Sequence, residues 1–243
     1  MKFVSLRKVA MATMLSMTLA TVAMPAVAEA ATSASISVSS TPTNLTTKSI
    51  VSNGSSHCAL LTSGRVDCWG YGNNGELGNG KFYTPGNYGS AKPVAVVSTS
   101  GSGTLSGVAS LTGTSYGYGA GYCALLTSGR VDCWGPGNDG QLGNGKFYTS
   151  GNQGSAKPVA VVSTSGSGTL SGVASLTGNG NGYGNEGYCA LLTSGRVDCW
   201  GYGRYGELGN GKFYTTSGNQ GSAKPVAVVS TSGSGTLSGV KLH

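Results

Sequence analysis

The chain repeats one unit three times, and this repetition limits its possible folds more than any other feature. A 13-residue segment, Cys-Ala-Leu-Leu-Thr-Ser-Gly-Arg-Val-Asp-Cys-Trp-Gly, begins at Cys58, Cys123 and Cys189. A second repeated segment that opens with Ala-Lys-Pro-Val-Ala-Val-Val begins at Ala91, Ala156 and Ala223. Tandem copies of this kind are arrays of supersecondary units that bury their apolar faces against one another. We expect repeats at residues 48–112, 113–177 and 178–243, with the third incomplete at its C-terminal end.

Each unit is predicted to form four short strands. In the first repeat the strands are expected at Ser56–Leu61, Arg65–Gly70, Pro93–Val97 and Val108–Thr112. The segment Thr62-Ser63-Gly64 fits a three-residue hairpin loop with Gly64 at positive φ. The many glycines lie between these apolar segments and indicate tight turns. No helical period follows the N-terminal segment.

Both faces of the predicted hairpin are apolar. Cys58, Leu60 and Val66 alternate with Ala59 and Leu61 along the two strands. A sheet with one solvated face would alternate apolar with polar residues. The pattern therefore predicts an all-β fold of three tandem four-stranded antiparallel blades, each covered by its neighbours as in a β-propeller.

The six cysteines fall into three pairs with nine residues between partners. The hairpin register places the members of each pair opposite one another at a non-hydrogen-bonded site. Zinc ligands usually come as closer pairs, Cys-x₂₋₄-Cys, so a metal site does not fit. In an exported chain we expect three disulfides. They join Cys58 to Cys68, Cys123 to Cys133, and Cys189 to Cys199.

Residues 1–30 have the pattern of a secretory signal peptide. Lys2, Arg7 and Lys8 precede a short apolar run, and two small-x-small cleavage sites end between Ala28 and Ala30. An uncleaved N-terminal anchor is the alternative. Residues 31–47 are rich in Ser and Thr and are expected to be a linker. The prediction is a bacterial protein that is secreted or held in the cell envelope, without a membrane span after signal cleavage.

The net charge of +7 is spread over the chain. Lys and Arg are distributed over all three repeats and form no polybasic tract, so no nucleic-acid partner is expected. The positive charges either provide solubility or attract anionic polymers of the cell surface.

The repeat resembles that of the regulator of chromosome condensation family. Residues 57–70 read His-Cys-Ala-Leu-Leu-Thr-Ser-Gly-Arg-Val-Asp-Cys-Trp-Gly, and residues 75–80 read Gly-Glu-Leu-Gly-Asn-Gly. Family repeats carry His-x-x-x-Leu, Gly-Arg-Val, Trp-Gly and Gly-Gln-Leu-Gly in that order, and the second copy even has the glutamine at Gln141. Tyr122 and Tyr188 replace the histidine in the later copies.

The resemblance implies a propeller of about seven blades. Three blades cannot close a ring, since closed propellers have at least four. Three outcomes are open: an open or incomplete ring, a homo-oligomer that completes the ring, or a fragment of a longer repeat protein.

No catalytic, metal or cofactor site is predicted. The two histidines are His57, beside a cysteine expected to be disulfide-bonded, and His243. Arg and Asp recur two residues apart in each hairpin, as at Arg65 and Asp67, and are expected to form local ion pairs. The glycine-rich loops lack the Gly-Lys-Ser/Thr of a phosphate-binding loop.

The candidate binding residues are tyrosines and lysines in the loops, where Tyr offers a large contact area at low entropic cost. The repeated pairs are Lys81 with Tyr83, Lys146 with Tyr148, and Lys212 with Tyr214. Further loop tyrosines are Tyr71, Tyr88, Tyr116, Tyr118, Tyr183, Tyr202 and Tyr205. These residues either contact a partner protein or a cell-surface polysaccharide, or pack their own loops.

The sequence favours an exported, non-catalytic interaction module that presents loops on a β scaffold. Two alternatives remain: a secreted protein inhibitor of an enzyme, and a nucleotide-exchange regulator by family analogy. The signal peptide, the cysteine pairs and the small number of blades argue against nucleotide exchange.

Overall fold

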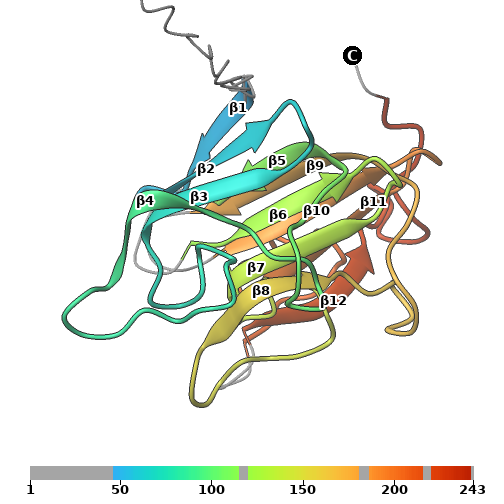
Figure 1. The fold of residues 1–243 in the computed structure, drawn as a ribbon. Coiled ribbons are helices and arrows are strands. Elements are labelled where there is room, and N and C mark those ends of the chain that lie inside the picture. Colours follow the sequence, from blue (N-terminus) through green and yellow to red (C-terminus); the bar gives the residue numbers. More distant parts are fainter. Residues whose placement is uncertain (1–45, 115–119, 181–185, 216–219, 242–243) are drawn as a thin grey trace, which may run out of the picture. The chain divides into compact units, whose positions relative to one another are not determined.

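The computed structural model describes residues 46–114, 120–180, 186–215 and 220–241 of the 243-residue chain. Within these ranges the fold is all-β, with three four-stranded antiparallel sheets that confirm the predicted fold class (Figure 1). The expected signal segment at 1–30 and residues 31–45 of the expected linker lie outside the described residues. The same is true of His243 and of Tyr116, Tyr118 and Tyr183.

Each sheet pairs its strands in a fixed order, with a hairpin at the centre. The first sheet contains β1 (Thr47–Ser52), β2 (Ser56–Leu61), β3 (Val66–Tyr71) and β4 (Gly89–Ala95). The second contains β5 (Val108–Gly113), β6 (Tyr122–Leu126), β7 (Val131–Pro136) and β8 (Gly154–Ala160). The third contains β9 (Val173–Gly180), β10 (Glu186–Leu192), β11 (Val197–Tyr202) and β12 (Gly221–Ala227).

The expected place of one strand was wrong. The segment Val108–Thr112 was predicted to close the first sheet, but β5 pairs with β6 and opens the second sheet. Likewise β1 pairs with β2 and is the first strand of its own sheet. Each sheet therefore takes its first strand from the residues just before its hairpin.

The central hairpins have the predicted register. Cys58 pairs with Cys68 and Leu60 with Val66, and the loop closes with Gly64 at a φ of 78°. Disulfides join Cys58 to Cys68, Cys123 to Cys133, and Cys189 to Cys199. The side chains of the two strands alternate between the two faces of the sheet, and both faces are apolar.

A bulge follows the second cysteine of each hairpin. The pairing of β3 with β4 shifts between Cys68 and Gly70, and Gly70 has a φ of 103°. A Cβ atom at Gly70 would lie 2.7 Å from the carbonyl oxygen of Ser55. Only glycine fits this conformation and this close approach. The next strand begins at Gly89, earlier than expected, so Pro93 lies inside edge strand β4, where a missing N–H is tolerated.

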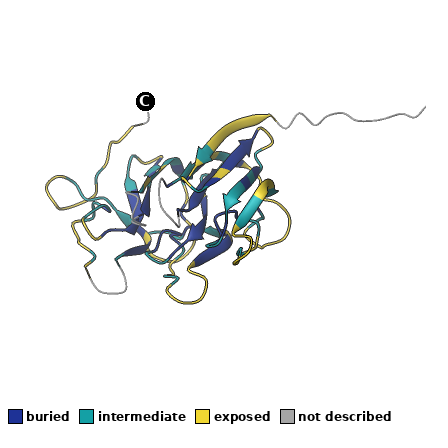
Figure 2. Cartoon of the chain, turned by 90° about the vertical axis from the view of Figure 1, so that its left-hand side faces the viewer, coloured by how far each residue is buried: buried dark blue, intermediate teal, exposed yellow. Residues whose placement is uncertain are grey.

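The sheets bury their apolar faces against one another. One cluster fills the space between the first and second sheets and includes Leu60, Val66, Tyr122 and Trp134. The equivalent cluster between the second and third sheets contains Trp200. The first strands are also neighbours, since the Lys48 Nζ donates a hydrogen bond to the Ala109 carbonyl at 2.8 Å. Figure 2 shows the result: the interior strands are buried, whereas β1 is exposed along most of its length.

The part of the chain that the structure describes contains no helix with the length and apolar character needed to span a membrane.

Candidate interaction surfaces

The three predicted lysines are exposed on equivalent loops between the third and fourth strands of their sheets. In each loop an asparagine side chain accepts a hydrogen bond from the lysine backbone N–H at 3.3 Å. The pairs are Asn79 with Lys81, Asn144 with Lys146, and Asn210 with Lys212. This turn fixes the backbone and leaves each ammonium group at the surface.

The three partner tyrosines are half-buried within the same loops. The hydroxyl of Tyr83 accepts a hydrogen bond from the Asn79 amide at 2.9 Å, and its ring packs against Gly72. Tyr148 and Tyr214 make the same contacts in their repeats. The structure therefore brings lysine and tyrosine together on each loop, with the ring anchoring the loop and the lysine facing solvent.

Two other tyrosines form an exposed aromatic pair in the first repeat. Tyr71 stacks on Tyr88, with 6.4 Å between ring centroids, and 50% of the Tyr88 surface is exposed. The rings border a shallow groove of about 340 Å³ that is also lined by Asn87 and Ser90. Flat aromatic rings beside polar side chains suit contact with a sugar ring or with a protein side chain.

The third repeat carries a second exposed aromatic cluster. Tyr205 is 65% exposed and lies beside Tyr202, with 6.1 Å between ring centroids. The Arg204 guanidinium lies 5.6 Å from the Tyr205 ring centroid, in a cation–π contact. The cluster is thus both aromatic and positively charged.

The middle repeat lacks these residues. Where the first repeat has Tyr88, the second has Gln153, and where the third has Arg204 and Tyr205, it has Asn138 and Asp139. Among copies that are otherwise almost identical, the first and third thus carry exposed aromatic residues at positions where the second has polar ones. The sequence named these tyrosines among many others, but only the structure separates the exposed from the buried ones.

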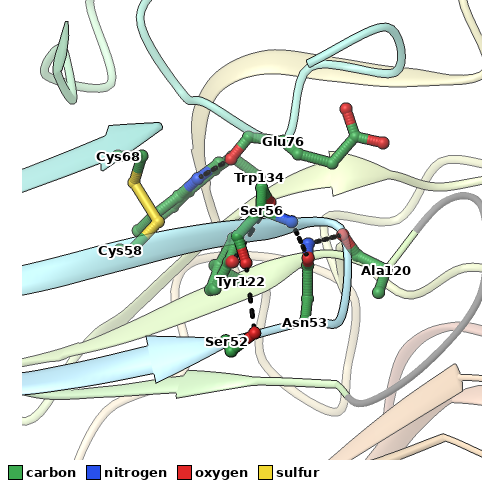
Figure 3. Close-up of a disulfide and its surroundings, with 9 residues drawn as sticks. All are labelled: Ser52, Asn53, Ser56, Cys58, Cys68, Glu76, Ala120, Tyr122 and Trp134. Carbon is green, nitrogen blue, oxygen red and sulfur yellow. Dashed lines mark hydrogen bonds between the residues drawn. A yellow bond between two sulfur atoms is a disulfide. The ribbon is translucent and has the colours of Figure 1, made fainter. Parts of the chain in front are cut away.

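A buried polar network links the first and second sheets (Figure 3). The Asn53 Oδ1 accepts the Ser56 backbone N–H at 2.7 Å, and the Asn53 Nδ2 donates to the Ala120 carbonyl at 2.6 Å. The Ser56 and Tyr122 hydroxyls lie 3.1 Å apart. Nearby, the Trp134 indole N–H donates to the Glu76 backbone carbonyl at 2.9 Å. These contacts satisfy buried polar groups and fix the two sheets together.

Two carboxyl groups are buried near this network, and no pattern in the sequence marks them as buried. Burial raises the pKa of Glu76 to about 7, although the Asn74 N–H donates to its Oε2 at 2.9 Å. Burial likewise raises the pKa of Glu186 to about 8, against the lowering effect of hydrogen bonds from Thr114 and Gly121. Gln141 occupies the position equivalent to Glu76 and accepts the same loop hydrogen bond, from Asp139, at 2.8 Å. The carboxyl at this position thus serves as a hydrogen-bond acceptor that an amide can replace.

No arrangement of acid, base and nucleophile is found within the described residues. His57 is exposed and stacks on Trp69, with 5.6 Å between ring centroids. The same residues contain no group of three or more His, Cys, Asp or Glu side chains that could hold a metal ion. The expected ion pair forms in the third repeat, where Arg196 binds both carboxylate oxygens of Asp198 at 3.0 and 2.8 Å.

No protein-family model matches the chain. Among curated proteins, E3 ubiquitin-protein ligase HERC2 from Homo sapiens and its counterpart from Mus musculus are each 29% identical to it over 161 residues. The aligned region covers 66% of this chain, and the chain spans only 3% of the length of those relatives.

Solved structures with repeat propellers are similar in fold. Yeast RCC1 (Prp20), solved bound to Kap60, matches with a TM-score of 0.56 and 15% identity over 76% of this chain and 37% of its own. Prp20p from Saccharomyces cerevisiae, characterised with its binding to Gsp1p and histones, gives 0.56 and 16% over 76% and 39%. Human WBSCR16 gives 0.52 and 22% over 75% and 38%. At these identities the likeness shows the fold alone.

Proposed function

We propose that this chain, whose three repeats are similar to those of the regulator of chromosome condensation family, is an exported, non-catalytic interaction module. It binds a partner protein or a cell-surface polysaccharide through the loops between the third and fourth strands. The observation that carries the proposal is the pair of exposed aromatic clusters, Tyr71 with Tyr88 and Tyr205 with Arg204.

The clusters have the chemistry of a binding surface. Exposed aromatic rings are costly to keep in water and contribute strongly when a partner covers them. The three exposed lysines, Lys81, Lys146 and Lys212, lie on the same set of loops and add positive charge, while Tyr83, Tyr148 and Tyr214 hold those loops in place. The combination suits a polar or anionic partner with flat groups that can stack.

Two of the proteins with a similar fold bind other proteins. Yeast RCC1 (Prp20) binds Kap60, and Prp20p has binding properties toward Gsp1p and histones. For this chain the three disulfides favour an extracytoplasmic place of action, since such bonds persist in oxidising compartments. The partner is therefore expected at or outside the cell surface.

Two substitutions test the aromatic clusters without altering the scaffold. Tyr88→Gln introduces the residue of the second and third repeats, and Tyr205→Asn introduces the residue of the first repeat, so neither strains the fold. Each removed aromatic contact is worth on the order of 1 kcal/mol, so the double variant should bind at least about tenfold more weakly. The measurement is retention of purified chain on isolated bacterial cell-wall material and on immobilised surface proteins.

Asp139→Asn, the equivalent change in the middle repeat, is the matched control and should bind like the unchanged chain. Equal retention of the double variant and the unchanged chain would contradict the proposed surface. Export has its own test by cell fractionation: disulfide-bonded chain in the medium or envelope is expected, and reduced chain in the cytoplasm would remove the exported part of the proposal.

A further inference from the structure

We propose that a second copy of this chain docks head to tail, with the first sheet of one copy covering the third sheet of another. The docked pair repeats the interface that already joins the sheets within one chain. Because the repeats are almost identical in sequence, each copy carries both halves of that interface at its two ends.

The tryptophans identify the first half. Trp134 and Trp200 are fully buried, and their indole N–H groups donate to backbone carbonyls of the preceding repeat, those of Glu76 and Gln141, at 2.9 and 3.0 Å. Trp69 is the same residue of the first repeat, yet it is partly exposed and stacks on the exposed His57. Its indole N–H has no acceptor in the part of the chain that the structure describes. The first sheet thus presents the face that a preceding repeat would cover.

Ile50 shows the same difference on the neighbouring strand. Its counterpart Leu111 is 8% exposed and belongs to the core between the first two sheets, whereas Ile50 is 62% exposed. The open face of the first sheet therefore carries an apolar side chain at the same position as the covered face of the second sheet.

The third sheet presents the other half. Leu60 and Val66 of the first sheet are each 1% exposed because the second sheet covers them. Their counterparts Leu191 and Val197 are partly exposed, as is Val228 beside them. The same side chains that form a core twice within the chain are thus left uncovered a third time.

Among the described residues, the backbone hydrogen bonds between loops of neighbouring repeats also leave one donor and one acceptor without such a partner at the two ends. The Gly80 N–H donates to the Ala156 carbonyl at 2.8 Å, and the Gly145 N–H donates to the Ala223 carbonyl at 2.7 Å, each bond joining one repeat to the next. The third copy of the donor is Gly211 and the first copy of the acceptor is Ala91, which is exposed. Within the described ranges these two groups have no such partner. In the docked pair, Gly211 of one copy would donate to Ala91 of the other.

A second copy fits these faces better than an unrelated protein would. The opposite end of the same chain supplies a counterpart for each of these three groups: the Glu207 carbonyl for Trp69, the Leu191 and Val197 side chains for Ile50, and Ala91 for Gly211. The two faces differ from each other, so the contact is heterologous rather than a two-fold symmetric one.

Sedimentation velocity of the purified chain tests the proposal over about 1 to 100 µM, the range in which moderate interfaces associate. The expected result is a mass that rises with concentration to at least twice that of one chain. A mass of one chain throughout this range would overturn the proposal.

Two substitutions on opposite ends make the test specific. Ile50→Lys blocks the first face and Leu191→Lys blocks the third. Each should remain a monomer alone, with an unchanged melting temperature and circular dichroism. Ile50→Lys alters a residue that is already largely exposed, so it keeps the test valid if Leu191→Lys fails to fold. Asp139→Asn, in the middle repeat and away from both open faces, should associate like the unchanged chain.

A mixture of the two lysine variants distinguishes head-to-tail docking from other modes. Ile50→Lys retains an intact third face and Leu191→Lys an intact first face, so the one-to-one mixture should form a pair and grow no further. A mixture that stays monomeric, or a single variant that associates like the unchanged chain, would contradict the proposed contact. Neither lysine variant alters an aromatic cluster, so failure here leaves the proposed binding function standing.

Discussion

At the scale of single residues, identical side chains differ according to which repeat contains them. The tryptophan after each second cysteine is buried and hydrogen-bonded in the second and third repeats but partly exposed in the first. The acidic residue of the following loop is buried as Glu76 and partly exposed as Glu207. Sequence alone assigns such copies the same environment, because what differs is the neighbour and not the residue.

Glu76 gives a prediction for the pH dependence of stability. Its carboxyl has a pKa of about 7 when folded, raised by burial from an ordinary value of 4.5. Below pH 4.5 the carboxyl is protonated in both states. Between about pH 4.5 and 7 the unfolded chain loses the proton first, so the free energy of unfolding falls as the pH rises. In Glu76→Gln the side chain still accepts the hydrogen bond from the Asn74 N–H, as Gln141 accepts one from the Asp139 N–H. Because the amide does not titrate, the substitution removes this loss of stability.

Glu76→Gln should therefore be more stable than the unchanged chain at pH 8, by about 3 kcal/mol at 1.36 kcal/mol per pKa unit, and equal to it at pH 4. Urea unfolding at the two pH values measures both differences. The control is Glu207→Gln, at the partly exposed copy of the position, for which a much smaller effect is expected. If Glu76→Gln were less stable at pH 8, the Glu76 carboxylate would be charged in the folded chain and would stabilise it.

At the scale of elements, the central hairpins could be predicted because their information is local. The loop at residues 62–64 sets the register, and the register brings the two cysteines of each pair face to face. The place of Val108–Gly113 could not be predicted in the same way. A repeat read from sequence has a period but no starting point, so the strand fits the end of one unit as well as the beginning of the next. Tertiary pairing with β6 decides between them.

The bulge and the exposed clusters also could not be predicted from the sequence. Gly70 looks like one more turn glycine, yet it lies within a strand, where Ser55 excludes a side chain. Tyr83 and Tyr88 look equally suited to binding, but a glycine and an asparagine hold the first in its loop. In both cases the deciding contact comes from a residue that the local pattern does not mark.

The disulfides give a prediction at this scale. Replacing Cys123 and Cys133 with alanine removes a cross-link across a short loop, which the chain-entropy model values at about 2.5–3 kcal/mol. It also leaves a small cavity, because both residues are fully buried between covered faces. The same change at Cys189 and Cys199 should cost less, since Cys189 lies on the open face of the third sheet and is partly exposed.

Chemical denaturation of the two double variants under oxidising conditions measures the difference. The Cys189 and Cys199 variant serves as the control for the loss of the cross-link itself. Equal losses of stability would mean that the covering of the middle sheet adds nothing to the effect of the cross-link.

At the scale of the whole molecule, three sheets are joined by two interfaces of the same design. Each interface combines an apolar cluster, an indole–carbonyl hydrogen bond and a glycine–alanine backbone hydrogen bond. In such arrays stability is close to a sum of unit and nearest-neighbour contributions. The middle sheet has two neighbours, and each of the outer sheets has one within the chain.

Hydrogen exchange should therefore be slowest in the middle sheet. In the monomeric Ile50→Lys variant, amides of β6 and β7 should exchange more slowly than the equivalent amides of β2 with β3 and of β10 with β11. These strands are covered on both faces only in the middle sheet, so their opening costs two interfaces. Mass spectrometry of peptides from the three hairpins measures the rates, and the near-identical sequences correct for intrinsic chemistry. Uniform protection would indicate that all three sheets open as one cooperative unit.

The hydrogen bond from Trp134 to Glu76 has a consequence for how such genes can change. It uses a backbone carbonyl as acceptor, so it survives any substitution at the acceptor position, as the bond from Trp200 to Gln141 illustrates. An unequal crossover that inserts one more repeat would supply a donor for the unit before it and an acceptor for the unit after it in a single event. Copy number can then drift by whole units, while each side chain remains free to diversify toward a new target.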